Sequence, residues 1–380
     1  MAVNTIPLGR EERLFAKAES TFGAFAMPAA TDAFAHRSAA FTLKRARDIR
    51  DDKRQSRSAL TRISGKKSGD WRIGGYLVPS GAAGTAPDMD VLLKAVFGSS
   101  SNSPGVSQTY SLASGVTLHD SLSMYQQLSH MARGFKGCIV NQAQFKVSGT
   151  GKAEVEFSGE YADEFYAGSC VTSGALVNLA TSVTLAAGEG KKFAVGGRIS
   201  IGTSAGPHEI TGISADTLTI TPGVAGAQAD AAAVTPYLLT PTIAGSPVPG
   251  CIGSFTIGGV TVYIVDGTVT LNNNMKLRTD EYGRTIAAGY SLGDRAVTFD
   301  LNLYLDKDYL RYYGDALQYV SKALVLTIGS TAGSICTINL PYAEFNIPPI
   351  DAGGNDEVKW KISGAALGSS GDDEISVVFT

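Results

Sequence analysis

Alternating apolar and polar residues recur along most of the chain, and this period of two predicts β-strands. In residues 152–160, apolar side chains occupy one face, while Glu154 and Glu156 occupy the other. A second alternating segment, 139–147, precedes it and is joined to it by a Ser-Gly-Thr-Gly sequence at 148–151. These features predict a β-hairpin whose two faces differ in polarity.

The C-terminal half shows the same alternation of apolar and polar residues. Residues 297–305 place five apolar side chains on one face and Asp300 among the polar residues of the other. Clusters of turn residues separate such segments at intervals of roughly 8–12 residues, which is typical of sandwiches and barrels. We therefore predict an all-β fold with one or two helices, built as a β sandwich or barrel.

Helical spacing of apolar residues is limited to short segments. Residues 10–20 show a short helical pattern. The first of two predicted helices after residue 80 covers 89–97, with Asp88 as its N-cap and Gly98 ending it. The second is predicted from about residue 306 to 320. Its expected buried positions are Leu310, Tyr313, Leu317 and Val320.

Residues 173–242 differ from their surroundings, because Gly, Ala, Thr and Ser dominate and aromatic residues are scarce. We interpret this segment as a small β-barrel inserted into the main domain, with a Pro- and Gly-containing return linker. The predicted organisation is an extended N-terminal arm over 1–72, a β-sandwich core over 73–172 and 243–380, and the inserted barrel over 173–242.

Charge is distributed unevenly. The whole chain has a formal net charge of −3, but residues 37–72 contain twelve basic and four acidic residues, a net charge of +8. The rest of the chain therefore carries −11. A basic arm on an acidic body can bind nucleic acid, bind a second copy of the same body, or form a solvated flexible loop. The absence of aromatic residues between Thr42 and Asp70 disfavours base stacking and hence nucleic-acid binding.

Catalytic and cofactor signatures are weak. Residues 202–206 match GxSxG beside His208, but a strand-like segment follows where a nucleophile elbow needs a helix, so a hairpin turn is favoured. The four histidines lack metal-ligand spacing. A β-sandwich hydrolase using Asp163 or Asp280 remains an alternative. We expect no enzymatic activity, no metal and no cofactor.

The cysteine and hydropathy patterns indicate in which cellular compartment the chain is expected. The four cysteines show no CxxC spacing and are interpreted as buried thiols. No apolar run approaches the roughly 18 residues of a membrane helix, and the N-terminus lacks the regions of a signal peptide. We expect a chain made and kept in the cytosol, with no membrane partner.

Several segments resemble the tail tube (major tail) proteins of long-tailed bacteriophages. They are RLFAKAESTFG at 13–23, GYLVPSG at 75–81, PDMDVLLKAVFG at 87–98, GCIVN at 137–141 and EISVVF at 374–379. The resemblance implies six protomers to a ring and rings stacked around a channel through which DNA passes transiently. It further implies a ruler (tape-measure) protein inside the tube and terminator and distal tail proteins at its ends.

Two site hypotheses follow from the charge pattern and this resemblance. Inter-subunit contacts are expected at Arg45, Arg47, Arg50, Arg54 and Arg57. The channel wall is expected to carry Glu154, Glu156 and Asp300, where an acidic surface would repel phosphate. We expect a structural protein of the virion tail that assembles in the host cytoplasm, with the inserted barrel facing outward. The alternative is a baseplate or host-recognition module that binds surface carbohydrate through the inserted barrel.

Overall fold

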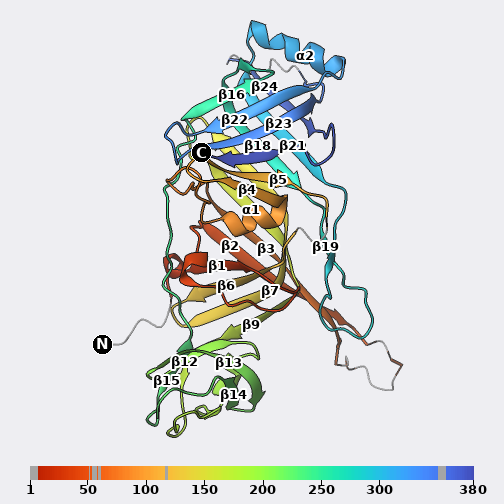
Figure 1. Ribbon diagram of the computed structural model, residues 1–380. Helices are drawn as coiled ribbons and strands as arrows, with labels where there is room; N and C mark the ends of the chain where they lie inside the picture. The colour runs from red at the N-terminus through yellow and green to blue at the C-terminus, as the bar shows by residue number, and fades with distance from the viewer. Residues whose placement is uncertain (1–6, 51, 54–57, 59–60, 116–118, 350–356) are drawn as a thin grey trace. The chain divides into compact units, whose positions relative to one another are not determined.

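The computed structural model describes residues 7–50, 52–53, 58, 61–115, 119–349 and 357–380 of the 380-residue chain. Strands dominate these residues, and two short α-helices occur among them (Figure 1). The predicted all-β class is therefore confirmed. The chain divides into two compact units. Unit 1 comprises residues 1–34, 122–138 and 162–242, and unit 2 comprises 35–121, 139–161 and 243–380.

Unit 1 contains two antiparallel sheets. In the first, the strand order is β1, β6, the beginning of β7, then β9. Its strands are β1 (Arg13–Ala18), β6 (Leu122–Leu128), β7 (Met131–Ser148) and β9 (Asp163–Ala167). Phe15, Tyr125 and Phe165 are central to the apolar cluster of this sheet.

The second sheet of unit 1 has six strands in the order β10, β15, β12, β13, β14, β11. They are β10 (Cys170–Val171), β11 (Ser182–Thr184), β12 (Arg198–Ile201), β13 (Ser204–Ser214), β14 (Thr217–Thr221) and β15 (Ala233–Pro236). Small β-branched and aliphatic residues form a separate core here, with Ile199, Ile210 and Leu218 fully buried. This sheet occupies the segment whose composition set it apart in the sequence.

Unit 2 is built on a wide antiparallel sheet. Its strand order is β2, β3, β8, the end of β7, β18, β21, β24, β23, β22, β16 and β17. β23 also pairs with β25, which continues to β5 and β4. The bounds are β2 (Ser38–Asp48), β3 (Ile63–Tyr76), β4 (Gly98–Ser103), β5 (Ser107–Leu112), β8 (Glu154–Tyr161), β16 (Gly253–Ile257), β17 (Val260–Thr261), β18 (Ile264–Asn272), β21 (Ala296–Tyr304), β22 (Lys322–Ile328), β23 (Cys336–Phe345), β24 (Lys359–Ala366) and β25 (Ser376–Phe379). A separate pair, β19 (Lys276–Leu277) with β20 (Tyr290–Ser291), lies in a connecting segment.

The two strongest sequence patterns form strands as predicted. β7 and β8 pair around the turn at 148–151, and Val155 and Phe157 of β8 are buried. On β21, Phe299 and Leu301 are among four alternating buried side chains. Burial of one face of each strand fixes its register, because a slip by one residue would expose that face.

Helix α1 (Asp90–Phe97) also agrees with the prediction. Leu92, Leu93 and Val96 are buried on its apolar side, and Gly98 ends it in the left-handed conformation at φ 85°. Met89, not Asp88, occupies the N-cap position. The Asp88 carboxylate instead accepts a hydrogen bond from the Ala244 amide.

The helical pattern over residues 10–20 does not form a helix, because this segment contains β1. Leu14, Phe15 and Ala16 are all buried, and β1 pairs along its full length with β6. Three consecutive buried residues fit a strand covered on both faces, although Leu14, Phe15 and Ala18 also have the spacing of one helical stripe. Residues 1–72, which were predicted as one extended arm, contain β1 in unit 1, and β2 with most of β3 in unit 2.

Helix α2 (Leu310–Leu317) exists, but the predicted buried face is wrong. Tyr312 and Ala316 are its buried residues, whereas Leu310 and Leu317 are about half exposed. The buried-thiol prediction holds for Cys138 and Cys336 but not for the exposed Cys251 or the half-buried Cys170. All four cysteines are free.

Candidate assembly surfaces

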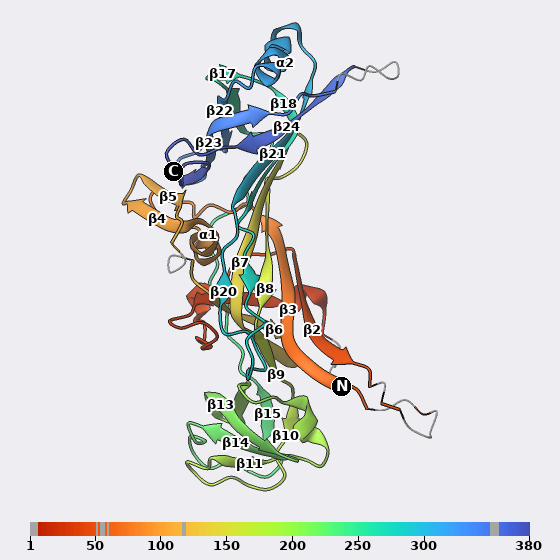
Figure 2. The same ribbon diagram turned by 90° about the vertical axis from the view of Figure 1, so that its right-hand side faces the viewer.

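The β2–β3 hairpin continues beyond the rest of its sheet as a two-stranded ribbon (Figure 2). β8 pairs with β3 only from Gly69 to Tyr76. The earlier part of β3, residues 63–68, pairs with β2 in the described part of the chain. Among the described residues, β2 has β3 as its ladder partner and so forms an edge strand of the sheet.

The ribbon carries the basic residues singled out in the sequence. Arg45 and Arg47 are exposed, and Arg50 is half-buried and forms an ion pair with Asp52. Arg54 and Arg57 lie outside the described residues. The guanidinium groups of Arg45 and Arg47 are therefore exposed to solvent on a hydrogen-bonded hairpin.

The three predicted channel-wall carboxylates lie on one face of the unit 2 sheet. Glu154 pairs with Lys146 on β7, Lys146 with Thr268 on β18, and Thr268 with Asp300 on β21. Directly paired residues in an antiparallel ladder point to the same side of the sheet. Glu156 is two residues from Glu154 and hence shares that side.

Each carboxylate has a cationic neighbour that the sequence pattern does not reveal. The ion pairs are Arg37 with Glu154, Arg72 (2.6 Å) and Lys146 (3.8 Å) with Glu156, and Lys361 (3.1 Å) with Asp300. Most of these side chains are substantially exposed, so each pair contributes about 0–1 kcal/mol to stability. Their main consequence is electrostatic: the face presents both charges, whereas the sequence led us to expect an acidic surface.

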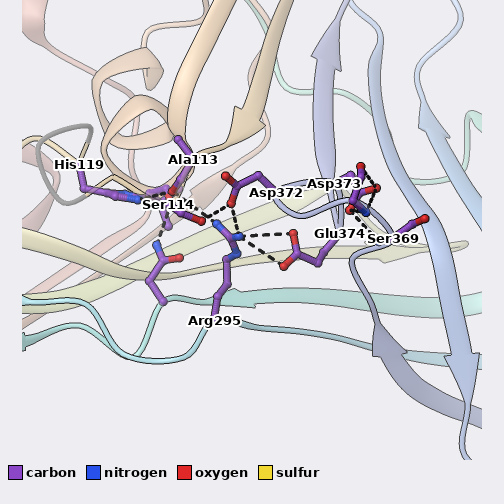
Figure 3. Close-up of polar contacts among 11 residues, drawn as sticks. Ala113, Ser114, His119, Arg295, Ser369, Asp372, Asp373 and Glu374 are labelled. Carbon is purple, nitrogen blue, oxygen red and sulfur yellow. Dashed lines mark hydrogen bonds and ion pairs between the residues drawn. The ribbon is translucent and has the colours of Figure 1, made fainter.

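A polar cluster around Arg295 joins the start of β21 to the loop before β25 (Figure 3). Arg295 Nη2 lies 2.6 Å from Asp372 Oδ1 and 3.3 Å from Glu374 Oε1. The Ser114 hydroxyl donates a hydrogen bond to Asp372. A neighbouring open pocket of about 390 Å³ is lined partly by Arg295 and Glu374. Since the two carboxylates pair with one guanidinium, the cluster is suited to fastening the loop.

His119 borders the same pocket but is engaged by the backbone. Its Nδ1 lies 3.0 Å from the Ala95 carbonyl oxygen, and its Nε2 lies 3.0 Å from that of Ala113. The side chain is 3% exposed. Both ring nitrogens therefore have backbone carbonyl partners.

We expect the Asp372 contacts to make the stability of unit 2 depend on pH. The Ser114 hydroxyl, followed by Arg295, lowers the pKa of Asp372 below its ordinary value. The ionised carboxylate thus stabilises the fold above its unfolded-state pKa, and this contribution is lost as pH falls through the lower folded-state pKa. Asp372→Asn should lower the free energy of unfolding by about 1 kcal/mol at pH 7, with the difference shrinking below about pH 4.

Urea titrations at several pH values measure this effect. Both tryptophans, Trp71 and Trp360, belong to unit 2, so their fluorescence reports its unfolding. Asp294→Asn is the control, because Asp294 is exposed in the same region. An Asp372→Asn penalty that stays constant from pH 7 to pH 3 would contradict the assignment.

The GxSxG segment is a hairpin turn between β12 and β13, as predicted. Ser204 and His208 are each 2% exposed, with 2.8 Å between Ser204 Oγ and His208 Nε2. Ser204 Oγ accepts from the Ala225 amide, and His208 Nδ1 lies 2.9 Å from the Pro222 carbonyl oxygen. The pair is thus enclosed in a structural network and is unsuited to nucleophilic attack on an external substrate.

The remaining candidates for chemistry are dispersed. Asp163 lies on β9 in unit 1, with Oδ2 3.4 Å from Lys136 Nζ, and Asp280 is an exposed loop residue of unit 2. Within the described ranges, no group of three or more His, Cys, Asp or Glu side chains is arranged to hold a metal ion. Nor does any helix in that part of the chain have the length and apolar character needed to cross a membrane.

Comparison with known proteins identifies one family. The family model described as phage tail tube protein matches residues 9–380, nearly the whole chain. A search of curated proteins finds no match. The family match covers both compact units and includes the segment with the six-stranded sheet.

Proposed function

Because the chain belongs to the phage tail tube protein family, it is a structural protein of the virion tail, and we propose that its copies form closed rings that stack around a DNA channel. Six copies to a ring is the number we propose from the sequence resemblance. The role requires binding between identical chains and no bond-making chemistry, so we propose that the protein has no catalytic activity.

The observation that carries this proposal is the wide antiparallel sheet of unit 2, in whose described part β2 is an edge strand. An exposed edge strand promotes uncontrolled pairing unless another strand or element covers it. A ring of identical subunits covers every such edge, because a heterologous contact that closes leaves no end unpaired. We propose that the outer edge of β2 contacts the adjacent copy.

We propose that the face carrying Glu154, Glu156 and Asp300 lines the channel. Their paired cations, such as Lys361 beside Asp300, support a wall of balanced charge. Strong DNA binding requires uncompensated cations that displace counterions from phosphates. A wall of closely paired charges binds phosphate weakly and lets DNA pass.

We propose that Arg45, Arg47 and Arg50, together with Arg54 and Arg57, contact acidic surface on an adjacent copy. In this arrangement the ribbon is a connector between subunits. We further propose that assembly takes place in the host cytoplasm, around a tape-measure protein and between terminator and distal tail proteins.

For residues 173–242 we propose an outward-facing decoration. The separate apolar core of this segment supports independent folding, because its buried residues pack mainly on one another. Replacing 173–242 with a short Gly-Ser linker should preserve tube formation, assessed by negative-stain electron microscopy. Loss of assembly in a variant that still folds would refute the decoration role, and loss of adsorption to host carbohydrate alone would favour the host-recognition alternative.

The direct test of self-assembly uses the purified full-length chain. Sedimentation velocity and negative-stain electron microscopy over a concentration series should show rings or tubes that increase with concentration. A species that remains monomeric at the highest concentration, including in the presence of a tail-derived nucleus, would refute the proposal.

A further inference from the structure

Residues 273–295, which connect β18 to β21, form a bridging segment that is anchored to the body of unit 2. Its two short strands pair with each other, Leu277 with Tyr290. The Leu277 amide donates a hydrogen bond to Glu160 Oε2 of β8 at 3.0 Å, and the Tyr290 hydroxyl donates to the carbonyl oxygen of His119. The Leu277 side chain is 7% exposed. Both ends of the bridging segment are therefore held by the fold.

The tip of the bridging segment contacts the root of the β2–β3 ribbon, where the ribbon leaves the sheet (Figure 1). The Lys67 amide of β3 donates to the Thr285 carbonyl oxygen at 3.1 Å, and Lys66 Nζ donates to the Glu281 carbonyl oxygen. β8 pairs with β3 only as far as Gly69. Since each edge of a strand presents its own backbone amides, the bridging segment occupies the edge of β3 that β8 leaves.

The tip has a defined conformation of its own. Glu281 Oε1 lies 3.7 Å from Arg278 Nε, and Glu281 Oε2 lies 3.5 Å from Arg284 Nε. The Arg278 amide donates to the Gly289 carbonyl oxygen at 2.9 Å, and Gly283 turns the chain at φ 81°. The charged side chains are substantially exposed, so these ion pairs add little stability. Their effect is to shape the turn that faces β3.

A two-stranded ribbon needs such a contact to keep one direction. An isolated β-hairpin is marginally stable, and a third strand or packed element is required to fix it. Beyond Gly69 the ribbon has lost β8, so this is the point at which it would bend. The bridging segment spans this point, because it is bonded to Glu160 of β8 on one side and to Lys67 of β3 on the other.

We propose that residues 279–288 position the ribbon: they fix its direction from the sheet in the free subunit, before it meets another copy. Thr285 and Glu281 are the positioning residues, and they act through β3. The inference deepens the proposed self-assembly and rests on it for its consequence. A ribbon that already has one direction presents Arg45 and Arg47 at a lower ordering cost on binding.

Double electron–electron resonance on the monomeric full-length chain tests the positioning role. Ser64 is exposed on β3 and Cys251 is an exposed thiol, so spin labels on Ser64→Cys and on the native Cys251 report ribbon-to-body distances. A Cys170→Ser background removes the half-buried thiol. The intact bridging segment should give one narrow distance distribution.

The main variant replaces residues 279–288 with Asn-Gly. This turn can close the hairpin beyond the Arg278–Gly289 hydrogen bond. The distance distribution should broaden about twofold, because the ribbon then has the freedom of an isolated hairpin. A distribution that stays narrow in the folded variant would overturn the positioning role.

Smaller substitutions provide the second variant and the control. Lys66→Met removes one of the two contacts and should broaden the distribution to a lesser extent. Lys322→Met is the matched control, because Lys322 Nζ lies 3.4 Å from Asp315 Oδ1, outside the ribbon and the bridging segment. Urea unfolding followed by tryptophan fluorescence establishes that each variant folds. If the Asn-Gly replacement does not fold, an unchanged distribution in Lys66→Met would overturn the proposal.

The replacement of residues 279–288 should also slow tube formation about tenfold, because the ribbon would hold the competent direction only part of the time. An unchanged rate with a broadened distribution would overturn the consequence for assembly. Absence of tubes in the unmodified protein would instead remove the proposed function, whereas the distance measurement on single subunits would stand.

Discussion

Reversing the charge of Arg45 and Arg47 should leave the protein folded but unable to form tubes. Both side chains are exposed on the β2–β3 ribbon, so the double substitution Arg45→Glu/Arg47→Glu removes little packing within the subunit. If the ribbon contacts acidic surface of another copy, two attractions become repulsions. Like charges placed together at an interface cost several kcal/mol. Sedimentation velocity should show monomers at concentrations where the unmodified chain assembles.

The control makes the same change of net charge elsewhere. Lys191 and Lys276 are exposed cations outside β2 and β3, and Lys191→Glu/Lys276→Glu should still assemble. Assembly of the ribbon variant at the same concentration as this control would show that the ribbon guanidinium groups make no essential contact. High salt should weaken assembly of the unmodified chain, because exposed ionic contacts are screened.

The second large effect is expected at Gly159 on β8. A Cβ at this position would lie 1.8 Å from the carbonyl oxygen of Ile139 and 3.1 Å from Trp71 Nε1. The indole nitrogen donates to that same carbonyl oxygen at 3.1 Å, with Trp71 only 1% exposed. Gly159→Ala should therefore force β8 away from β7 and lower the free energy of unfolding by about 3 kcal/mol.

Urea unfolding followed by tryptophan fluorescence measures this loss, and Gly314→Ala is the matched control. Gly314 lies in α2, and nothing would lie within 4 Å of its added Cβ. That variant should gain up to about 1 kcal/mol, because alanine favours the helix. If Gly159→Ala fails to fold, Trp71→Phe tests the same contact, with an expected cost of about 1–3 kcal/mol for the unsatisfied carbonyl. A neutral effect of both changes would contradict the packing described here.

The local sequence pattern was sufficient to predict the strands in which buried and exposed residues alternate. β8 and β21 each bury every second side chain, so the sequence identified both strands and the faces of Glu154 and Asp300. The sequence also predicted that β7 pairs with β8, because only the short turn at 148–151 separates the two strands. Helix α1 was recognisable from its apolar spacing and from Gly98 at its end.

Pattern failed where tertiary pairing decided the structure. β1 pairs with β6 more than 100 residues away, and a segment buried on both faces lacks alternation, so Leu14 and Phe15 suggested a helix. In α2 the apolar Leu310 and Leu317 remain exposed, which local spacing could not reveal. A short amphipathic pattern indicates a helix but does not say which residues the rest of the fold covers.

The candidate surfaces were only partly predictable, because the partners of their charged residues are set by tertiary strand pairing. Composition located the basic ribbon and the acidic residues, but the neighbours of Glu156 and Asp300 come from other strands: Arg72 from β3 and Lys361 from β24. These pairs depend on the order and register of distant strands. The two alternating lysines of β24 were visible in the sequence, but their pattern did not show that one of them would pair with Asp300.

We propose that this chain lines a tube with the polar face of its wide sheet. A cryo-electron microscopy reconstruction of the assembled protein tests it most directly. We predict a hollow tube with Glu154, Glu156 and Asp300 directed into the lumen. A tube in which these side chains face outward or lie within subunit contacts would contradict the account.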